Sequence, residues 1–243
     1  MNPLKPLNRK NYGSIGHLPS SRMGPSDHHV HEGQQRICTV KARDKHDVII
    51  VTEKLDGSNV GVARVDDTIY ALGRSGYLAQ TSKFEQHQLF ADWVRRDEQK
   101  WLEVLKPGER LVGEWLAQAH GTRYSSLPNG PFIAFDLMVE SKRLPWIDFV
   151  AKCHVHNIPS AILLHKGGPI SVVDVMHKYN HYWLDGIHPD DGPEGVVYKV
   201  ERNGEFDFMA KFVRPDKIDG KYLPEVSGKE PIWNWRPHVK NND

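Results

Sequence analysis

Apolar side chains along this chain recur mainly with the two-residue period of β-strands, and only three segments show the longer period of helices. The strand-like runs are rich in Val, Ile and aromatic residues and end at Gly, Pro, Asn or Asp. The pattern predicts these strands: Val48–Glu53, Val60–Val65, Ile69–Leu72, Arg110–Trp115, Phe132–Met138, Ala161–Leu164, Val196–Val200 and Phe206–Val213.

The first helical segment opens with a capping-box pattern, Ser82 with Glu85, and stops before Pro107-Gly108. Polar residues 97–100 interrupt its apolar face, so the segment can be one helix or two. Two further helices are predicted, one over Trp146–Cys153 that ends near Pro159 and a weaker one from Ser171 to about Tyr182. Strands and helices do not alternate regularly, which predicts an α+β domain of antiparallel sheets with flanking helices.

The chain divides by composition into three parts. Residues 1–47 are polar and rich in turn-forming Gly and Pro, so we expect an N-terminal polar segment packed on the core. Residues 48–220 hold the predicted strands and helices and are expected to form the main domain, which 243 residues can supply with a sizeable core. Residues 221–243 are left as a short C-terminal tail.

Charge and cysteine content limit the function classes. The chain has 32 Lys+Arg against 31 Asp+Glu, so any affinity for nucleic acid must come from a local basic patch. No apolar run approaches the roughly 20 residues that span a bilayer, and the N-terminus lacks the apolar core of a signal peptide. Cys38 and Cys153 have no metal-binding spacing, and so few cysteines predict no disulfide framework, which favours a cytoplasmic location without a membrane partner.

The segment from Glu53 to Asn59, with the sequence EKLDGSN, places a lysine and a carboxylate beside a glycine turn between two predicted strands. Lys54 can act as a covalent nucleophile if its surroundings lower its pKa, because an ammonium group cannot attack. By itself this segment is equally typical of a strand edge with a solvated lysine. Its weight comes from the residues that follow in order: Arg74, Glu114, Phe135-Asp136, Glu194 to Lys199, and Lys211.

Several of these residue types suit phosphate chemistry. Lysines such as Lys199 and Lys211 can stabilise oxygens that gain negative charge in a phosphoryl-type reaction, although solvated strand lysines are the ordinary alternative. Glu114 interrupts an apolar strand, so its carboxylate must be paired or must face a site. A single carboxylate with waters and substrate phosphates is a typical Mg²⁺ site, which Glu194 could supply.

This ordered set resembles the covalent nucleotidyltransferase superfamily of ATP-dependent ligases and mRNA capping enzymes. The likeness runs from about Tyr12 to Lys217 and is strongest to RNA ligases of the RNA ligase 2-like group. It implies an ATP-grasp-like adenylation domain. In such enzymes a lysine takes AMP from ATP, passes it to a 5′-phosphate end, and a 3′-hydroxyl then displaces it.

The resemblance implies a role for each matching residue. Lys54 is the implied nucleophile, with Lys199 and Lys211 on the phosphates. The implied ATP-binding residues are Glu53, Asn59, Arg74, Glu114, Phe135 and Glu194. Glu194, and Asp136 through water, are the implied holders of Mg²⁺ or Mn²⁺. Asn59, Arg74, Arg214 and Lys217 are the implied RNA contacts. Met209 departs from the family pattern, where a lysine usually precedes Lys211 by two residues.

Two segments allow more than one interpretation. The loop Asp27–Glu32 contains three histidines; adjacent histidines make an awkward zinc set without cysteine, so contact with nucleic acid or a cover over the ATP pocket is favoured. In the tail, basic residues with Trp233 and Trp235 could bind RNA, or the two tryptophans could simply fix the tail to the core.

The sequence therefore predicts an ATP-dependent RNA ligase that joins 5′-phosphate and 3′-hydroxyl ends, at nicks in duplex RNA, in RNA repair. The Ser58-Asn59 ending favours RNA over DNA by resemblance. A DNA or mixed RNA/DNA ligase, and a catalytically degenerate protein that binds RNA ends, remain alternatives. Too few residues follow Lys211 for the C-terminal OB domain of DNA ligases, so a partner protein, a homodimer or the N-terminal segment is expected to help bind substrate.

Overall fold

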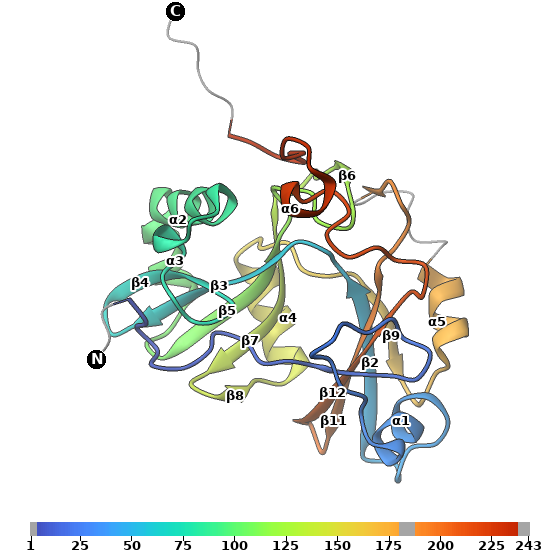
Figure 1. Cartoon of the computed structure of the whole chain (residues 1–243). Helices are drawn as coiled ribbons and strands as arrows, with labels where there is room; N and C mark the ends of the chain where they lie inside the picture. The colour runs from blue at the N-terminus through green and yellow to red at the C-terminus, as the bar shows by residue number, and fades with distance from the viewer. Residues whose placement is uncertain (1–3, 180–187, 238–243) are drawn as a thin grey trace, which may run out of the picture.

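The computed structural model describes residues 4–179 and 188–237, and two five-stranded sheets dominate it (Figure 1). The first sheet has the order β1 (Gly16–His17), β12 (Glu205–Val213), β11 (Gly195–Arg202), β2 (Asp47–Lys54) and β9 (Leu163–Gly167). The second has the order β4 (Thr68–Gly73), β3 (Ser58–Val65), β5 (Glu109–Trp115), β7 (Phe132–Val139) and β8 (Lys142–Arg143). A short pair joins β6 (Tyr124–Ser126) and β10 (His188–Pro189).

Strand pairs are antiparallel throughout, apart from the parallel pair of β1 with β12, so the expected α+β class with antiparallel sheets is confirmed. The helices are α1 (Glu32–Thr39), α2 (Glu85–Arg96), α3 (Glu98–Val104), α4 (Trp146–Val155), α5 (Val172–Tyr179) and α6 (Pro224–Ser227), with a 3₁₀ turn over Ala79–Thr81. After Val213 the described residues form α6 and loops, without an OB barrel.

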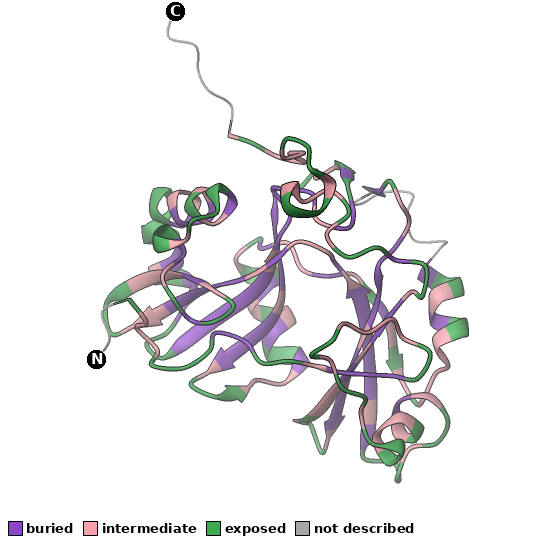
Figure 2. Ribbon diagram, in the orientation of Figure 1, coloured by how far each residue is buried: buried purple, intermediate pink, exposed green. Residues whose placement is uncertain are grey.

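Strand β2 is a nearly unbroken apolar run because each of its two faces packs in a different hydrophobic core. Ile50 packs in the core that joins the second sheet to α2, α3 and α4, whereas Ile49 and Val51 pack in the core between the first sheet, α1 and α5. Successive side chains of a strand point to opposite faces, so a strand covered on both faces needs apolar residues at both parities. In Figure 2, much of both sheets is drawn in the purple that marks buried residues.

The turn of residues 55–57 connects the end of β2 in the first sheet to the start of β3 in the second. Gly57 is required there because a Cβ atom would lie 2.5 Å from the carbonyl oxygen of Trp115. The chain thus carries the predicted nucleophile, Lys54, to the junction of the two sheets.

The N-terminal segment crosses from the second sheet to the first (Figure 1). The backbone N–H of Asn11 donates to the carbonyl of Arg74, beside β4, and a few residues later His17 pairs with Lys211 in the first sheet. The tail packs on the second sheet, where the Trp235 ring lies 5.6 Å from Trp115. This packing agrees with the alternative in which the two tryptophans fix the tail to the core.

Two local predictions need correction. The predicted strand 161–164 begins later, as β9 from Leu163, because the backbone N–H groups of Ala161 and Ile162 bond instead to the Ala134 carbonyl and the Glu53 carboxylate. The capping box at Ser82 is wrong: α2 starts at Glu85, and the Ser82 hydroxyl bonds the N–H of Phe84 and the His87 ring.

The segment before Pro107 forms two helices, α2 and α3, that meet at Asp97, which is one of the two alternatives that the sequence left open. Helix α1 was not predicted at all: its eight residues include Gly33, and only Cys38 among them is buried. The end of the third predicted helix, beyond Tyr179, lies outside the described residues. No described helix is long and apolar enough to cross a membrane.

We predict that Gly195→Ala destabilises the fold by about 1–3 kcal/mol, because the new methyl group would collide with the Phe212 carbonyl in the adjacent strand. Urea denaturation measures the change. Gly33→Ala is the matched control, since nothing lies within 4 Å of its added Cβ and alanine favours the helix. Equal stability of Gly195→Ala and wild type would contradict the strand packing described here.

Candidate active site

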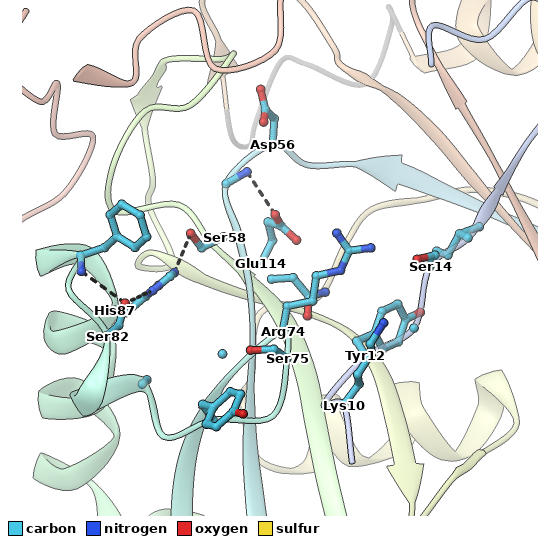
Figure 3. A pocket seen from close by; sticks show the side chains of 18 of the residues that line it. Lys10, Tyr12, Ser14, Asp56, Ser58, Arg74, Ser75, Ser82, His87 and Glu114 are labelled. Carbon is cyan, nitrogen blue, oxygen red and sulfur yellow. Dashed lines mark hydrogen bonds between the residues drawn. The ribbon is translucent and has the colours of Figure 1, made fainter. Parts of the chain in front are cut away.

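A cleft of about 1030 Å³ opens beside the junction of the two sheets. Its walls come from the turn after β2, from β3 and β5, from the β4 turn, and from the N-terminal segment. Figure 3 shows Glu114, Arg74 and Tyr12 pointing into this space from different elements. Among the predicted site residues, the cleft is lined by Lys54, Asn59, Arg74, Glu114 and Lys211.

Lys54 forms a short ion pair at the base of this cleft, with 2.6 Å between its Nζ and Oε2 of Glu194. The sheet enforces the pair: Lys54 lies opposite Gly195 in the β2–β11 ladder, and Glu194 immediately precedes that glycine. Burial alone would lower the pKa of Lys54, but the negative charges of Glu194, Glu114 and Asp56 outweigh it and raise the pKa above its ordinary value. In this state Lys54 is a protonated, unreactive amine.

Glu114 lies on β5 opposite Asn59 of β3, and its Oε1 accepts a hydrogen bond of 3.1 Å from the N–H of Gly57. Burial, with Glu194 and Asp56 nearby, raises the pKa of Glu114 to about 8 against the attraction of Lys54. Burial likewise raises the pKa of Glu194 to about 7. Three carboxylates therefore surround one ammonium group, and the site carries surplus negative charge when all three are ionised.

Asp56 is fixed from behind by Lys217 and Thr122. Its Oδ2 lies 3.3 Å from Lys217 Nζ and accepts a hydrogen bond of 3.1 Å from the Thr122 hydroxyl. Lys217 is only 4% exposed and also donates to the Gly121 carbonyl, so the implied RNA contact of Lys217 needs correction. Its ammonium group is used inside the protein, where it orients Asp56.

A smaller cavity of about 100 Å³ lies beside Lys54 and is lined by Glu53, Phe135, Trp146 and Lys199, among others. In the β5–β7 ladder Asp136 faces Val112 while Ala134 faces Gly113, so Phe135 is the extra residue of a bulge. Bulges redirect side chains, and Phe135 presents a half-buried ring to this cavity. The Glu53 carboxylate accepts hydrogen bonds from the Ile162 N–H and the Tyr179 hydroxyl.

Asp136 is fully buried in a network that uses both of its oxygens. Lys199 Nζ lies 2.9 Å from Oδ1, while Arg143 Nε at 2.8 Å and the Tyr12 hydroxyl at 3.0 Å contact Oδ2. The described contacts thus favour a supporting role for Asp136, which holds Lys199 at the cavity, over the implied role on metal-bound water. Arg143 was not predicted as a site residue, although its strand β8 pairs directly with β7, which carries Phe135 and Asp136.

Lys211 faces the cleft from β12, and Asp27 of the N-terminal segment lies 3.4 Å from its Nζ. His17 Nε2 lies 3.2 Å from the same carboxylate. Burial, and then the charge of Lys211, lowers the pKa of His17 to about 4, so this ring is neutral near pH 7. The contact of Asp27 with Lys211 agrees with the expectation that the Asp27–Glu32 loop covers the ATP pocket. His17 was not named as a site residue, because the segment before residue 48 has no regular pattern.

The implied RNA contacts are not all brought together. Arg74 is exposed at the β4 turn and points into the cleft, and Asn59 lies on β3 with a buried Oδ1 that has no hydrogen-bond partner among the described residues. Arg214 instead bonds the carbonyl of Asp191 and lines none of the described cavities. Across the described ranges, no three His, Cys, Asp or Glu side chains form a metal-binding group.

The two-sheet arrangement and this lysine-centred cleft define a nucleotidyltransferase-type fold. A family model for RNA ligase matches residues 47–213, and the chain therefore belongs to the RNA ligase family. The match covers β2 through β12 and thus includes Lys54, Glu114, Glu194 and Lys211.

Solved structures share the fold at low identity. A variant of Naegleria gruberi RNA ligase with ATP and Mn gives a TM-score of 0.54 at 18% identity, over 90% of this chain and 65% of that one. An archaeal ATP-dependent RNA ligase gives a TM-score of 0.51 at 20% identity, over 83% of this chain and 48% of that one. A candidate ATP-dependent DNA ligase from Aquifex aeolicus gives a TM-score of 0.54 at 19% identity, over 83% of this chain and 49% of that one.

Among curated proteins, an uncharacterized protein of Methanocaldococcus jannaschii is 26% identical over 165 residues, which are 63% of this chain and 38% of that protein. The chain thus spans less than two thirds of the length of these relatives.

We predict that the stability of wild type falls as pH rises from about 5 to 8, in part through Glu114. Folded Glu114 keeps its proton up to about pH 8, whereas the unfolded carboxyl loses it near pH 4.5, so rising pH favours unfolding. Glu114→Gln should make this decline shallower in urea titrations at several pH values. His17 makes stability rise with pH, but its contribution is the same in variant and wild type and so cancels in the comparison. If stability depends on pH equally in Glu114→Gln and wild type, the buried, protonated state of Glu114 is contradicted.

Proposed function

We propose that this protein is an ATP-dependent RNA ligase that forms a covalent lysyl-AMP at Lys54. The AMP passes to a 5′-phosphate end, which is then joined to a 3′-hydroxyl, at nicks in duplex RNA during RNA repair. The observation that carries the proposal is the Lys54–Glu194 ion pair, with Glu114 and Asp56 beside it, inside the segment that matches the RNA ligase family.

In the first step a bond forms between Lys54 Nζ and the α-phosphorus of ATP, and the bond from that phosphorus to the bridging oxygen breaks to release pyrophosphate. The amine must lose a proton before attack. Glu194 is hydrogen bonded to Nζ, and its raised pKa of about 7 suits a proton acceptor near neutral pH. Lys211, at the rim of the same cleft, is placed to balance charge on the phosphates.

The residues present fit a divalent metal of the Mg²⁺ or Mn²⁺ type. Glu194 and Glu114 offer hard oxygen donors beside Lys54, and such ions bind through one or two carboxylates together with water and substrate phosphates. When bound, the metal would supply positive charge that neutralises the carboxylates and the phosphate oxygens. The same positive charge would weaken the interactions by which Glu194, Glu114 and Asp56 hold Lys54 protonated.

The cavity lined by Phe135 and Glu53 is proposed to take the adenine. The Phe135 ring offers a stacking surface, and Lys199 lies at the same cavity, anchored by Asp136. Arg74 and Asn59, across the cleft, are proposed to orient the acceptor end. Residues 48–220 would form the adenylation domain, with residues 1–47 packed on it and residues 221–243 as a tail.

Two alternatives have some support. The fold shared with a candidate DNA ligase keeps a DNA or mixed RNA/DNA substrate open. A degenerate protein that binds RNA ends is the other. Met209, whose sulfur accepts a hydrogen bond of 3.4 Å from the Tyr12 hydroxyl, favours it, yet Lys211 still faces the cleft. A partner protein, a homodimer or the N-terminal segment is proposed to assist in substrate binding. Cys38 and Cys153 are free and buried, which fits the proposed cytoplasmic setting.

We expect ATP labelled on the α-phosphate, with Mg²⁺, to leave label on denatured wild-type protein, and γ-labelled ATP to leave none. Lys54→Ala should lose the label completely because no other described residue holds its position at Glu194. Lys166→Ala, an exposed strand lysine, is the matched control and should label as wild type does. A wild type that takes no label and carries no adenylate by mass spectrometry would refute the proposed mechanism.

Arg74→Ala is predicted to keep most lysyl-adenylate formation and to lose strand joining by about 10²-fold, since Arg74 points into the cleft from the turn after β4 and would orient the acceptor end. Single-turnover assays on a nicked duplex measure the two steps separately. An equal loss in both steps would place Arg74 on the nucleotide instead.

A further inference from the structure

A second pocket of about 340 Å³ lies where the N-terminal segment crosses the edge of the first sheet. It is lined by the histidine-rich loop and by residues far from it in sequence: His28, His29, His31, Gln34, Arg143 and Phe206. Ile15 and Met209 line both this pocket and the proposed adenine cavity, and Ser14 lines both this pocket and the main cleft. The pocket is therefore adjacent to the candidate active site.

Arg143 supplies the fixed positive group of this pocket. Its guanidinium is sandwiched between two rings, 4.7 Å from the Tyr12 centroid and 4.9 Å from the Phe206 centroid. Its Nε bonds Asp136, and the five N–H donors of a guanidinium leave others for a ligand. Arg143 and Lys199 share the single carboxylate of Asp136, so this cluster carries surplus positive charge.

No carboxylate lines the pocket among the described residues. Asp207 follows Phe206 directly, but neighbouring strand residues face opposite sides, and Asp207 bonds Arg43 there. The imidazoles of the loop and the amide of Gln34 can donate to phosphate oxygens in addition to Arg143. The chemistry of the pocket thus suits a phosphate ester.

The pocket also has an apolar side, made of Phe206, Met209 and Ile15. Pyrophosphate or the end of a triphosphate would gain nothing from these groups. A nucleobase would, because unpaired RNA bases stack on aromatic rings, and the Phe206 ring lines this pocket. Its volume lies within the range of small-molecule sites.

We propose that this pocket binds an unpaired nucleotide of the RNA substrate, with the base against the Arg143–Phe206 stack and the phosphate on Arg143 and the loop imidazoles. The inference rests on the proposed function for its substrate class. It gives the histidine-rich loop a role as an RNA-binding wall next to the active site.

The test measures RNA binding directly, without turnover. A 5′-phosphorylated single-stranded oligoribonucleotide with a 3′ fluorophore is titrated in EDTA and followed by anisotropy. Phe206→Leu keeps the apolar volume but removes the ring, and His28→Ala removes an exposed donor. Each should raise Kd about 5- to 10-fold, in the range of single stacking or polar contacts. His154→Ala, an exposed histidine on α4, is the matched control and should bind as wild type does.

Lysyl-adenylate formation is measured on the same variants and should stay unchanged. Unchanged Kd in both variants, or a wild type that does not bind the oligonucleotide, would overturn the proposal. Slower adenylate formation with unchanged RNA binding would also overturn it, and would assign the pocket to the phosphates of ATP. Weaker RNA binding in a protein that forms no adenylate would support the pocket and refute the proposed ligase activity.

Discussion

The ion pair between Lys54 and Glu194 is the interaction on which the rest of this site depends. It joins β2 to the residue before β11 at the point where the chain leaves one sheet for the other, so the geometry of both sheets fixes it. Around it, Asp56 adds negative charge, as does Glu114 above its raised pKa of about 8, and Lys217 holds Asp56 from behind. The free protein therefore holds Lys54, the proposed nucleophile, in protonated form, and we propose that ATP with a divalent metal would release it.

The N-terminal segment completes the site rather than merely covering it. Tyr12 contributes to the network that anchors Lys199, and Asp27 reaches Lys211. The same segment forms one wall of the cleft and one wall of the neighbouring histidine-lined pocket. Nucleotide binding and the proposed RNA binding would thus share one continuous surface between the N-terminal segment and the two sheets.

Much of the fold was predictable from the sequence, since strands such as β2 and β7 show dense apolar runs ended by turn residues. The site was predictable where residues lie within ordered motifs, as with Lys54, Glu114 and Glu194. Helix α1 was missed because Gly33 and a mostly polar composition hide its single buried residue. The burial of Lys217 and the stacking of Arg143 could not be predicted either, because both depend on partners about 100 or more residues away, such as Thr122 for Lys217 and Tyr12 for Arg143.

Glu194 is expected to keep Lys54 protonated in the free protein. The most direct test of this is an NMR titration of the Lys54 side chain with ¹³Cε-labelled lysine, in wild type and in Glu194→Gln, assigned through the loss of the signal in Lys54→Ala. We expect a Lys54 pKa above its ordinary value of 10.5 in wild type and a clear fall in Glu194→Gln. A wild-type Lys54 that already titrates below its ordinary pKa, or a pKa that Glu194→Gln leaves unchanged, would contradict it.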